Sequence, residues 1–465
     1  MNRPNILLIM TDEHAPMYSG PYGHPLVQTP FMDQLAAEGA TFANAYCNSP
    51  LCLPSRMSFM TGRYITQIGA FDNASPLPSD AVTWAHRLRA AGYDVVLSGK
   101  QHFCGPDQLH GFRAQLARDL HGVLRGTPDW SKGTPPADKP WGGVAEAGPG
   151  TTLEIEVDDL VEEQALAYLR DSARKERPWA LNVSFIAPHF PLVVPERFFN
   201  LYPLDQIDMP EIPPGHLESQ HPVHQRMRAM FGGVDFPEEQ VRRARAGYYG
   251  LITYLDEKIG RLLAALEETG QRDNTLIVHF SDHGEMNGEH GMWRKSKVPL
   301  QMVYPEQIPA GRHIGEVVSL VDLVATIVDV ADAPNAGPLD GDSLLGLLQG
   351  QDADWKDEAF SEYLAHGVAG PTAMLRRGRY KLHYSLGDPP QLYDVEADPN
   401  EFDDLANHPA HAATLADLQK RLLSEWDPVA IEAQVRQSQQ DRLLIEQATQ
   451  QDRLLIEQAM QRSPN

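Results

Sequence analysis

Cys52 stands in the segment LCLPSR, with Pro54 two positions later and Arg56 four positions later. The 465-residue chain has only two other cysteines, Cys47 and Cys104. Their odd number and irregular spacing match neither a disulfide framework nor a zinc-ligand pattern. The spacing leaves three interpretations of Cys52 open: a small buried residue, a thiol nucleophile, or the precursor of a modified residue.

Charged residues follow four short apolar runs that are typical of strands buried on both faces. The runs are Asn5–Met10, Asp94–Ser98, Trp179–Ile186 and Thr275–Phe280. The residues that follow them are, in order, Asp12 and Glu13, Lys100 and His102, His189, and Asp282 with His283. Because ligands bind beyond the carboxyl ends of strands in a parallel α/β sheet, we expect these side chains at one edge.

Two of these strand ends supply the residues of a metal site. Asp12, Glu13 and Asp282 offer carboxylate oxygens, and His283 offers an imidazole nitrogen. Oxygen-rich ligation favours one hard divalent cation, Ca²⁺ first and Mg²⁺ or Mn²⁺ as alternatives, over Zn²⁺.

Cationic residues surround the same predicted point and would hold an anionic group. They are Arg56, Lys100, His102, His189 and Lys295. A metal together with cations neutralises charge, orients a substrate and supports protonation of a leaving group. This combination is what transfer of a sulfuryl or phosphoryl group requires.

Alternating apolar runs and amphipathic segments predict the elements that position these residues: an α/β fold with a large, mostly parallel sheet between helices. We expect a catalytic domain over residues 1–350. From Trp355 the pattern changes to alternating strands, which predicts a smaller C-terminal α+β subdomain over residues 351–430. A helical tail over residues 431–465 completes the chain.

The tail contains a tandem repeat, in which QQDRLLIEQAT (Gln439–Thr449) is followed by QQDRLLIEQAM (Gln450–Met460). A period of eleven residues keeps one apolar seam along a helix. The repeat either lengthens a surface helix or forms a contact in a homo-oligomer, and the pattern leaves both open.

The chain is strongly acidic, with 39 Lys and Arg against 63 Asp and Glu and a formal net charge of −24. This charge argues against nucleic acid or an anionic membrane as a partner, although local cations can still hold a small anion. The apolar run near the N-terminus is too short for a signal sequence, so we expect a cytoplasmic protein.

Several motifs stand in order over about residues 4–406: PNILLIMTDE, CLPSR, SFMTGRY, GYDVVLSGKQHF, PHFP, SDHGEMNGEHGMWRK and LYDVEADPNEFDDLA. They resemble the motifs of type I sulfatases in the alkaline phosphatase superfamily, and the chain is most similar to choline-sulfatase-related cytoplasmic enzymes. The resemblance implies an alkaline-phosphatase-like fold and hydrolysis of a small sulfate ester.

The resemblance also implies that a formylglycine-generating enzyme oxidises Cys52 to formylglycine before the chain folds. In such sulfatases one hydroxyl of the hydrated aldehyde attacks sulfur, and the second helps to expel sulfate, so that covalent catalysis proceeds in two steps. Arg56 would then steady the diol.

The remaining site residues take their roles from the same resemblance. Asp12, Glu13, Asp282 and His283 match metal-site positions, although relatives have Asp, Gln or Asn where this chain has Glu13. Lys100, His102, His189 and Lys295 would contact sulfate, with His189 or Lys295 protonating the leaving oxygen and His102 assisting sulfate elimination. Asn73 and Glu362 match substrate-side positions.

The chain departs from this family where relatives carry a longer loop after MWRKS, because Lys297 to Leu300 follow here at once. Other functions stay open. The nearest is a phosphonate monoester or phosphodiester hydrolase, which shares the fold, metal site and formylglycine. A cysteine hydrolase with His102 or His189 as base, and a non-catalytic scaffold, are the other two.

Overall fold

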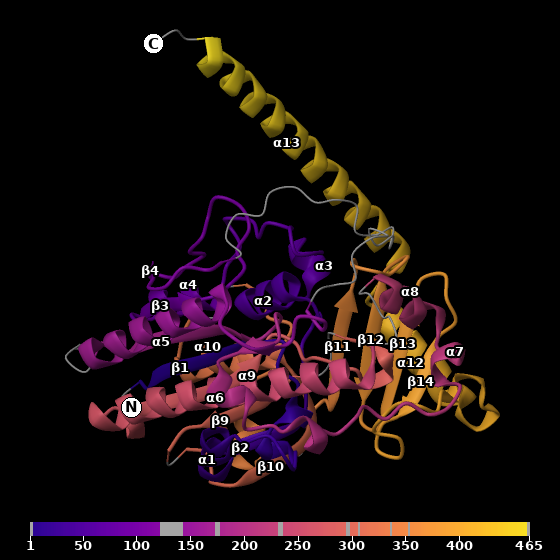
Figure 1. Cartoon of the computed structure of the whole chain (residues 1–465), viewed down its shortest axis with the longest axis horizontal. Coiled ribbons are helices and arrows are strands. Elements are labelled where there is room, and N and C mark those ends of the chain that lie inside the picture. Colours follow the sequence, from indigo (N-terminus) through magenta and orange to yellow (C-terminus); the bar gives the residue numbers. More distant parts are fainter. Residues whose placement is uncertain are drawn as a thin grey trace.

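The computed structural model describes residues 3–120, 143–172, 177–230, 236–293, 298–305, 307–334, 337–351 and 354–462. Within them an eight-stranded sheet forms the centre of the molecule (Figure 1). Its strands, in spatial order, are β10 (Arg312–Ser319), β2 (Ala40–Tyr46), β9 (Leu300–Val303), β8 (Thr275–Ser281), β1 (Asn5–Asp12), β6 (Trp179–Pro188), β3 (Asp94–Gly99) and β4 (Ala114–Gln115). The pairs are parallel except those of β9, which runs antiparallel to β2 and β8. The expected α/β fold with a large, mostly parallel sheet is confirmed.

Strand β1 explains why both faces of the sheet are covered. Ile6, Leu8 and Met10 belong to one buried cluster, whereas Leu7 and Ile9 belong to another. Successive side chains of a strand point to opposite faces, so an uninterrupted apolar run needs helices on both sides.

The helices divide between these two faces. One face packs against α1 (Pro30–Glu38), α5 (Leu153–Ser172), α6 (Glu196–Phe199) and α9 (Glu238–Glu268). The other packs against α2 (Cys52–Thr61), α4 (Trp84–Ala90), α10 (Leu320–Val330) and α11 (Leu345–Gln349). Other short elements within residues 1–350 are α3 (Ile65–Ile68), α7 (His216–Ser219), α8 (Pro222–Met230), and the paired strands β5 (Gly148–Pro149) and β7 (Val193–Val194).

A second, antiparallel sheet lies at one end of the molecule (Figure 1). It consists of β11 (Glu358–Tyr363), β12 (Thr372–Arg377), β13 (Tyr380–Ser385) and β14 (Gln391–Asp394), and α12 (Ala412–Leu423) packs on it. The predicted boundary near residue 430 falls in the first turn of α13 (Pro428–Arg462). The domain boundaries themselves stay predictions.

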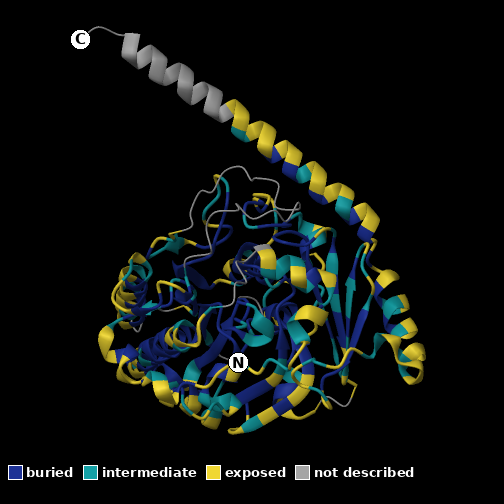
Figure 2. Ribbon diagram, turned by 45° about the vertical axis from the view of Figure 1, so that its right-hand side comes forward, coloured by how far each residue is buried: buried dark blue, intermediate teal, exposed yellow. Residues whose placement is uncertain are grey.

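Helix α13 begins against the second sheet and then extends away from the body (Figure 1). Its first turns include buried Ile431 and Val435, whereas Leu444 and Ile445 further along are exposed (Figure 2). Among the described residues, no helix combines the length and apolar character needed to cross a membrane.

Candidate active site

Cys52 is the first residue of α2 and is buried. The preceding Leu51 is extended, and Pro54 lies within the first turn, where a helix tolerates proline because the missing N–H has no partner there. The helix ends at Gly62, whose φ of 68° is the left-handed conformation that favours glycine. The partial positive charge of the N-terminus of α2 therefore lies beside Cys52.

Strands β1 and β8 bring two carboxylates to the same point. Thr11 pairs with Ser281, so Asp12 and Asp282 leave adjacent strands side by side. The backbone N–H of Glu13 donates to Asp282 Oδ1 at 3.2 Å, and that of Asp282 donates to the Thr11 carbonyl at 3.2 Å. These bonds hold the two strand ends together.

The Cys52 sulfur lies among these groups. It is 3.2 Å from His283 Nε2 and 3.8 Å from Asp12 Oδ1. Ligand atoms of Asp12, Cys52, Asp282 and His283 all lie within 4.8 Å of one another, and all four residues are buried. The predicted convergence of these residues at one sheet edge is therefore present in the structure.

Glu13 and His189 approach the same place from β1 and from the segment after β6. His189 Nε2 is 3.3 Å from Glu13 Oε2. Glu13, His189 and Asp12 together form a second group of ligand atoms within 4.8 Å. Glu13 has a φ of 64°, which costs a residue with a side chain free energy and is typical of functional sites.

Arg56 lies one turn along α2 and is completely buried. Its Nε donates to Asp282 Oδ2 at 2.8 Å, and its Nη2 donates to Asp12 Oδ2 at 3.2 Å. Its Nη1 donates to the Lys100 carbonyl at 2.7 Å and to Ser184 Oγ at 2.9 Å. One guanidinium thus connects α2 with β1, β8, β6 and the end of β3.

Lys100 supplies a second buried cation, and its Nζ forms an ion pair with Asp12 Oδ2. Burial alone lowers the pKa of Lys100, but Asp12 and Cys52 outweigh this and hold it above its usual value. Burial likewise opposes ionisation of Asp12, yet Lys100, His189 and Arg56 hold the pKa of Asp12 well below its usual range. Asp12 is therefore an ionised carboxylate.

Asp282 behaves differently from Asp12. Burial raises the pKa of Asp282 above its ordinary value, and Arg56 offsets this only in part. The Ser55 hydroxyl donates to the Asp282 carbonyl at 2.5 Å, which fixes the backbone at this position. The two carboxylates hence have unequal proton affinities although they lie in one site.

The segment after β3 is shaped by Gly99 and by Asp119. A Cβ on Gly99 would lie 2.1 Å from the Ser184 carbonyl, so this close approach of β3 to β6 requires glycine. Asp119 Oδ2 accepts hydrogen bonds from the backbone N–H groups of Gln101, at 2.9 Å, and His102, at 2.5 Å. These contacts hold the buried His102 at a φ of 61°.

The donor set fits a hard divalent cation. Asp12 and Asp282 place two buried carboxyl groups beside His283, and Glu13 adds a third beside Asp12 and His189. Buried carboxylates are costly unless cations or hydrogen bonds balance them. Arg56 and Lys100 balance part of this charge. Carboxylate oxygens with one imidazole are the ligands that Ca²⁺, Mg²⁺ and Mn²⁺ accept.

Of the other predicted site residues, Asn73 and Glu362 lie outside this cluster, and Lys295 lies outside the described residues. Asn73 Oδ1 accepts from the Leu53 N–H at 3.0 Å, which places it beside the first turn of α2. Glu362 accepts from Trp426 Nε1 at 2.9 Å and from Thr66 Oγ1 at 3.1 Å.

A cavity of about 790 Å³ lies between the two sheets and the segment that follows His283. The described residues that line it include Glu362, Trp293 and Tyr46 but none of the charged residues around Cys52. Glu362 as a substrate-side residue stays a prediction.

The sequence patterns missed residues that support the site from inside the fold. Ser184 binds Arg56 from the interior of β6, Ser55 fixes Asp282, and Asp119 shapes the loop at His102. A serine inside the apolar run WALNVSFI was the one available signal for Ser184.

Fold and site together define a class of α/β protein in which a residue at a helix N-terminus faces buried carboxylates and cations at a sheet edge. A model of the family described as sulfatase matches residues 4–333, and one described as N-sulphoglucosamine sulphohydrolase, C-terminal, matches residues 288–427. The choline-sulfatase of Rhizobium meliloti is 38% identical over 96% of this chain and 91% of its own length. A multifunctional alkaline phosphatase superfamily protein of Trinickia caryophylli is 30% identical over 91% of this chain and 95% of its own length.

Among solved structures, the phosphonate monoester hydrolase of Agrobacterium radiobacter superposes with a TM-score of 0.75 at 26% identity. The match covers 93% of this chain and 96% of that one. The sulfatase model covers well over half of the residues, and the chain therefore belongs to the sulfatase family of sulfuric ester hydrolases.

Proposed function

We propose that the chain hydrolyses a small organic sulfate ester to an alcohol and inorganic sulfate, using formylglycine derived from Cys52 and one divalent cation. The observation that carries this proposal is the position of Cys52. It lies at the N-terminus of α2, 3.2 Å from His283 Nε2 and 3.8 Å from Asp12 Oδ1. When present, the formylglycine hydrate supplies the hydroxyl that attacks sulfur, and its oxygens take the place of the Cys52 sulfur.

The chain's own residues then divide the remaining work. Arg56 and Lys100, both buried, hold negative charge beside Cys52. Burial strengthens their electrostatic effect on a developing sulfate because little water screens it. His102 assists release of sulfate, and His189, the most exposed member of the cluster, protonates the departing alcohol oxygen. Lys295 is the alternative proton donor and stays a prediction from the sequence.

Asp12, Glu13, Asp282 and His283 would hold the cation, most simply Ca²⁺, with Mg²⁺ or Mn²⁺ as alternatives. Bound there, the cation supplies charge neutralisation and orientation of the sulfate group. Removal of metal with a chelator should abolish turnover, and adding back each cation separately should identify the one that restores it. Full activity in protein that contains no detectable bound metal would contradict the proposed role of the cation.

The modification of Cys52 has a direct test. Mass spectrometry of the peptide that contains Cys52 should show the aldehyde or its hydrate in active protein, and activity should scale with that fraction. Cys47→Ala is a matched control because Cys47 is also buried. Fully active protein with an unmodified Cys52 thiol would refute the formylglycine mechanism, and it would revive the cysteine hydrolase.

A phosphonate monoester or phosphodiester hydrolase is the second candidate function. The superposition on the Agrobacterium radiobacter phosphonate monoester hydrolase favours it, because sulfate and phosphonate esters have similar geometry.

Among sulfate esters, a panel of cationic, aryl and sugar sulfates identifies the alcohol. Choline sulfate belongs in this panel because of the Rhizobium meliloti relative.

We also propose that the chain forms a homo-oligomer through α13. Leu444 and Ile445 are 67% and 64% exposed on this helix, and an exact repeat of DRLLIEQA follows eleven residues later. Exposed apolar residues on a projecting helix are typical of an interaction surface.

A further inference from the structure

A buried ion pair connects the first part of α13 with a loop of the catalytic domain. Arg442 donates through Nη1 to Asp72 Oδ1 and through Nη2 to Asp72 Oδ2, each at 2.6 Å. Asp72 is fully buried and Arg442 is 8% exposed. A bidentate pair fixes the relative position and the orientation of its two groups, so it constrains geometry as well as adding stability.

The Asp72 carboxylate also determines the shape of its own loop. Oδ1 accepts from the Ala74 N–H at 3.0 Å and from Ser75 Oγ at 3.2 Å. Ser75 Oγ in turn accepts from the N–H groups of Phe71 and Asp72, each at 3.1 Å. The orientation that Arg442 gives to the carboxylate is thereby passed to residues 71–75.

Asn73, in the middle of this loop, contacts two segments of the candidate active site. Its Oδ1 accepts from the N–H of Leu53, the residue that follows Cys52 in α2. The Asn73 carbonyl accepts a hydrogen bond from Cys104 Sγ at 3.6 Å, and Cys104 lies two residues after His102. The loop is therefore placed between the Cys52 turn and the segment that carries Lys100 and His102.

Apolar packing joins the same parts of the molecule. Phe71 from the loop and Ile65 from α3 share one buried cluster with Trp426, Ile431 and Val435. The beginning of α13 and the loop around Asn73 consequently form one packed unit. A change at Arg442 is transmitted through this unit because buried, close-packed groups cannot shift independently.

We propose that Arg442 is a positioning residue for the reaction at Cys52, acting through Asp72 and Asn73 on the first turn of α2. The C-terminal helix is then part of the architecture that holds the nucleophile. This proposal rests on the proposed function only in needing a reaction at Cys52, and it does not depend on which ester is cleaved.

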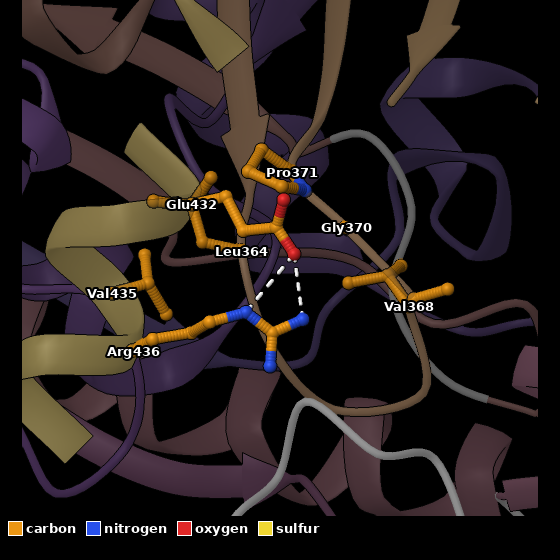
Figure 3. A pocket seen from close by; sticks show the side chains of 8 residues that line it. Leu364, Val368, Gly370, Pro371, Glu432, Val435 and Arg436 are labelled. Carbon is orange, nitrogen blue, oxygen red and sulfur yellow. Dashed lines mark hydrogen bonds and ion pairs between the residues drawn. The ribbon is translucent and has the colours of Figure 1, made fainter. Parts of the chain in front are cut away.

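Two substitutions in the full-length chain test it. Arg442→Ala removes the pair with Asp72, and Arg436→Ala is the matched control on the same helix. Arg436 bonds Glu432 beside the connection between β11 and β12, and its side chain is 45% exposed (Figure 3). Steady-state kinetics are measured well below the melting temperature of each variant, and rates are referred to the folded fraction.

We expect Arg442→Ala to lower kcat by about tenfold to a hundredfold, because a small displacement of a nucleophile has effects of this size. The change in KM should be smaller than the change in kcat, and Arg436→Ala should leave both unchanged. Arg442→Lys, which keeps the charge but not the bidentate geometry, should give an intermediate kcat. An Arg442→Ala variant that melts earlier but keeps its kcat would overturn the proposal.

A double-variant cycle identifies the route. If Arg442 acts through Asp72, Arg442→Ala combined with Asp72→Asn should be no slower than the slower single variant. Multiplying effects would overturn that route.

A second measurement needs no turnover and so separates this proposal from the proposed function. In protein made without the modifying enzyme, Arg442→Ala should raise the rate at which an alkylating reagent labels Cys52 at least severalfold. Wild-type protein that cleaves no sulfate ester would refute the proposed function, but the labelling ratio would still decide the role of Arg442. An unchanged labelling rate at Cys52 counts against it.

Discussion

Arg56 has more contacts with the reacting region than any single lysine could make. It donates to Asp12, Asp282 and Ser184 and to the Lys100 carbonyl, and it is completely buried. Arg56→Lys keeps the charge but cannot form these bonds together, since an ammonium group lacks the planar array of donors. We expect kcat/KM to fall at least a hundredfold and the free energy of unfolding to fall by about 3 kcal/mol.

The measurement is kcat/KM for a sulfate ester together with a urea unfolding curve. Arg197→Lys is the control because Arg197 makes a bidentate pair with Glu257 and its side chain is 62% exposed. Exposed pairs contribute little, so the control should change the free energy of unfolding by less than about 1 kcal/mol. Retention of kcat/KM within about threefold in Arg56→Lys would show that its contacts are not needed for catalysis.

At this scale the sequence predicted the charged residues but not the polar residues that hold them. Asp12, Lys100 and Asp282 follow apolar runs, and this position predicts that they lie at a sheet edge. Ser184 accepts a hydrogen bond from Arg56, and Asp119 accepts one from the backbone N–H of Gln101. Both contacts form only when the chain is folded. Such contacts join residues distant in sequence, and no local pattern encodes them.

At the scale of the elements, four strands could be predicted because their apolar runs are continuous, and the long helices could be predicted because their apolar residues recur at helical spacing. The structure has them as β1, β3, β6, β8, α5, α9 and α10. The sheet edge formed by β2 and β10 was not predicted. Its strands mix polar with apolar residues, as in Thr41 and Asn44 of β2, and β9 has only four residues. Their pairing depends on tertiary contacts more than on local propensity.

Strand β11 carries a buried carboxyl group, Glu362, that bonds Thr66 of α3 and Trp426 of the segment between α12 and α13, and it makes this contact sensitive to pH. Burial raises the pKa of Glu362 to about 7, and bonds from Trp426 and Thr66 offset only part of this effect. Between about pH 4.5 and about pH 7 the folded chain keeps a proton that the unfolded chain has lost. The contribution of Glu362 to stability is therefore full below this window and falls as the pH rises through it.

Glu362→Gln cannot ionise and so isolates this contribution. The melting temperature of wild type minus that of the variant should decrease as the pH rises from about 5 to about 8. Glu358→Gln on the same strand is the control, because Glu358 pairs with Arg421 near the surface. A difference that stays constant or increases with pH would contradict the assignment.

For the whole molecule, α13 is the element whose role the rest of the fold does not explain. The body buries its first turns, and the exposed Leu444 and Ile445 lie beyond them (Figure 2). If copies associate there, Leu444→Gln combined with Ile445→Gln should convert the oligomer to a monomer in light scattering. Activity per chain should be unchanged, because neither substitution adds a charge beside Arg442. Val429→Gln, at an apolar position 65% exposed on the same helix, should leave the oligomer intact.

Monomeric wild-type protein would refute the proposed homo-oligomer, but it would not affect the positioning role of Arg442. The two proposals concern different faces of α13, because Arg442 is buried against Asp72 whereas Leu444 and Ile445 are exposed. The sequence repeat indicated the helix, but the repeat alone could not show that Arg442 turns inward to Asp72, since its copy Arg453 stands in the same local sequence.

The function proposed for the residues around Cys52 is sulfate ester hydrolysis. It is tested by kcat/KM for a matched aryl sulfate and aryl phosphonate ester, measured on protein whose Cys52 peptide has been shown to carry formylglycine. We expect a clear preference for the sulfate ester, and Arg56→Lys should lower kcat/KM for that ester at least a hundredfold. A strong preference for the phosphonate ester would contradict the claim and assign the site to phosphoryl chemistry.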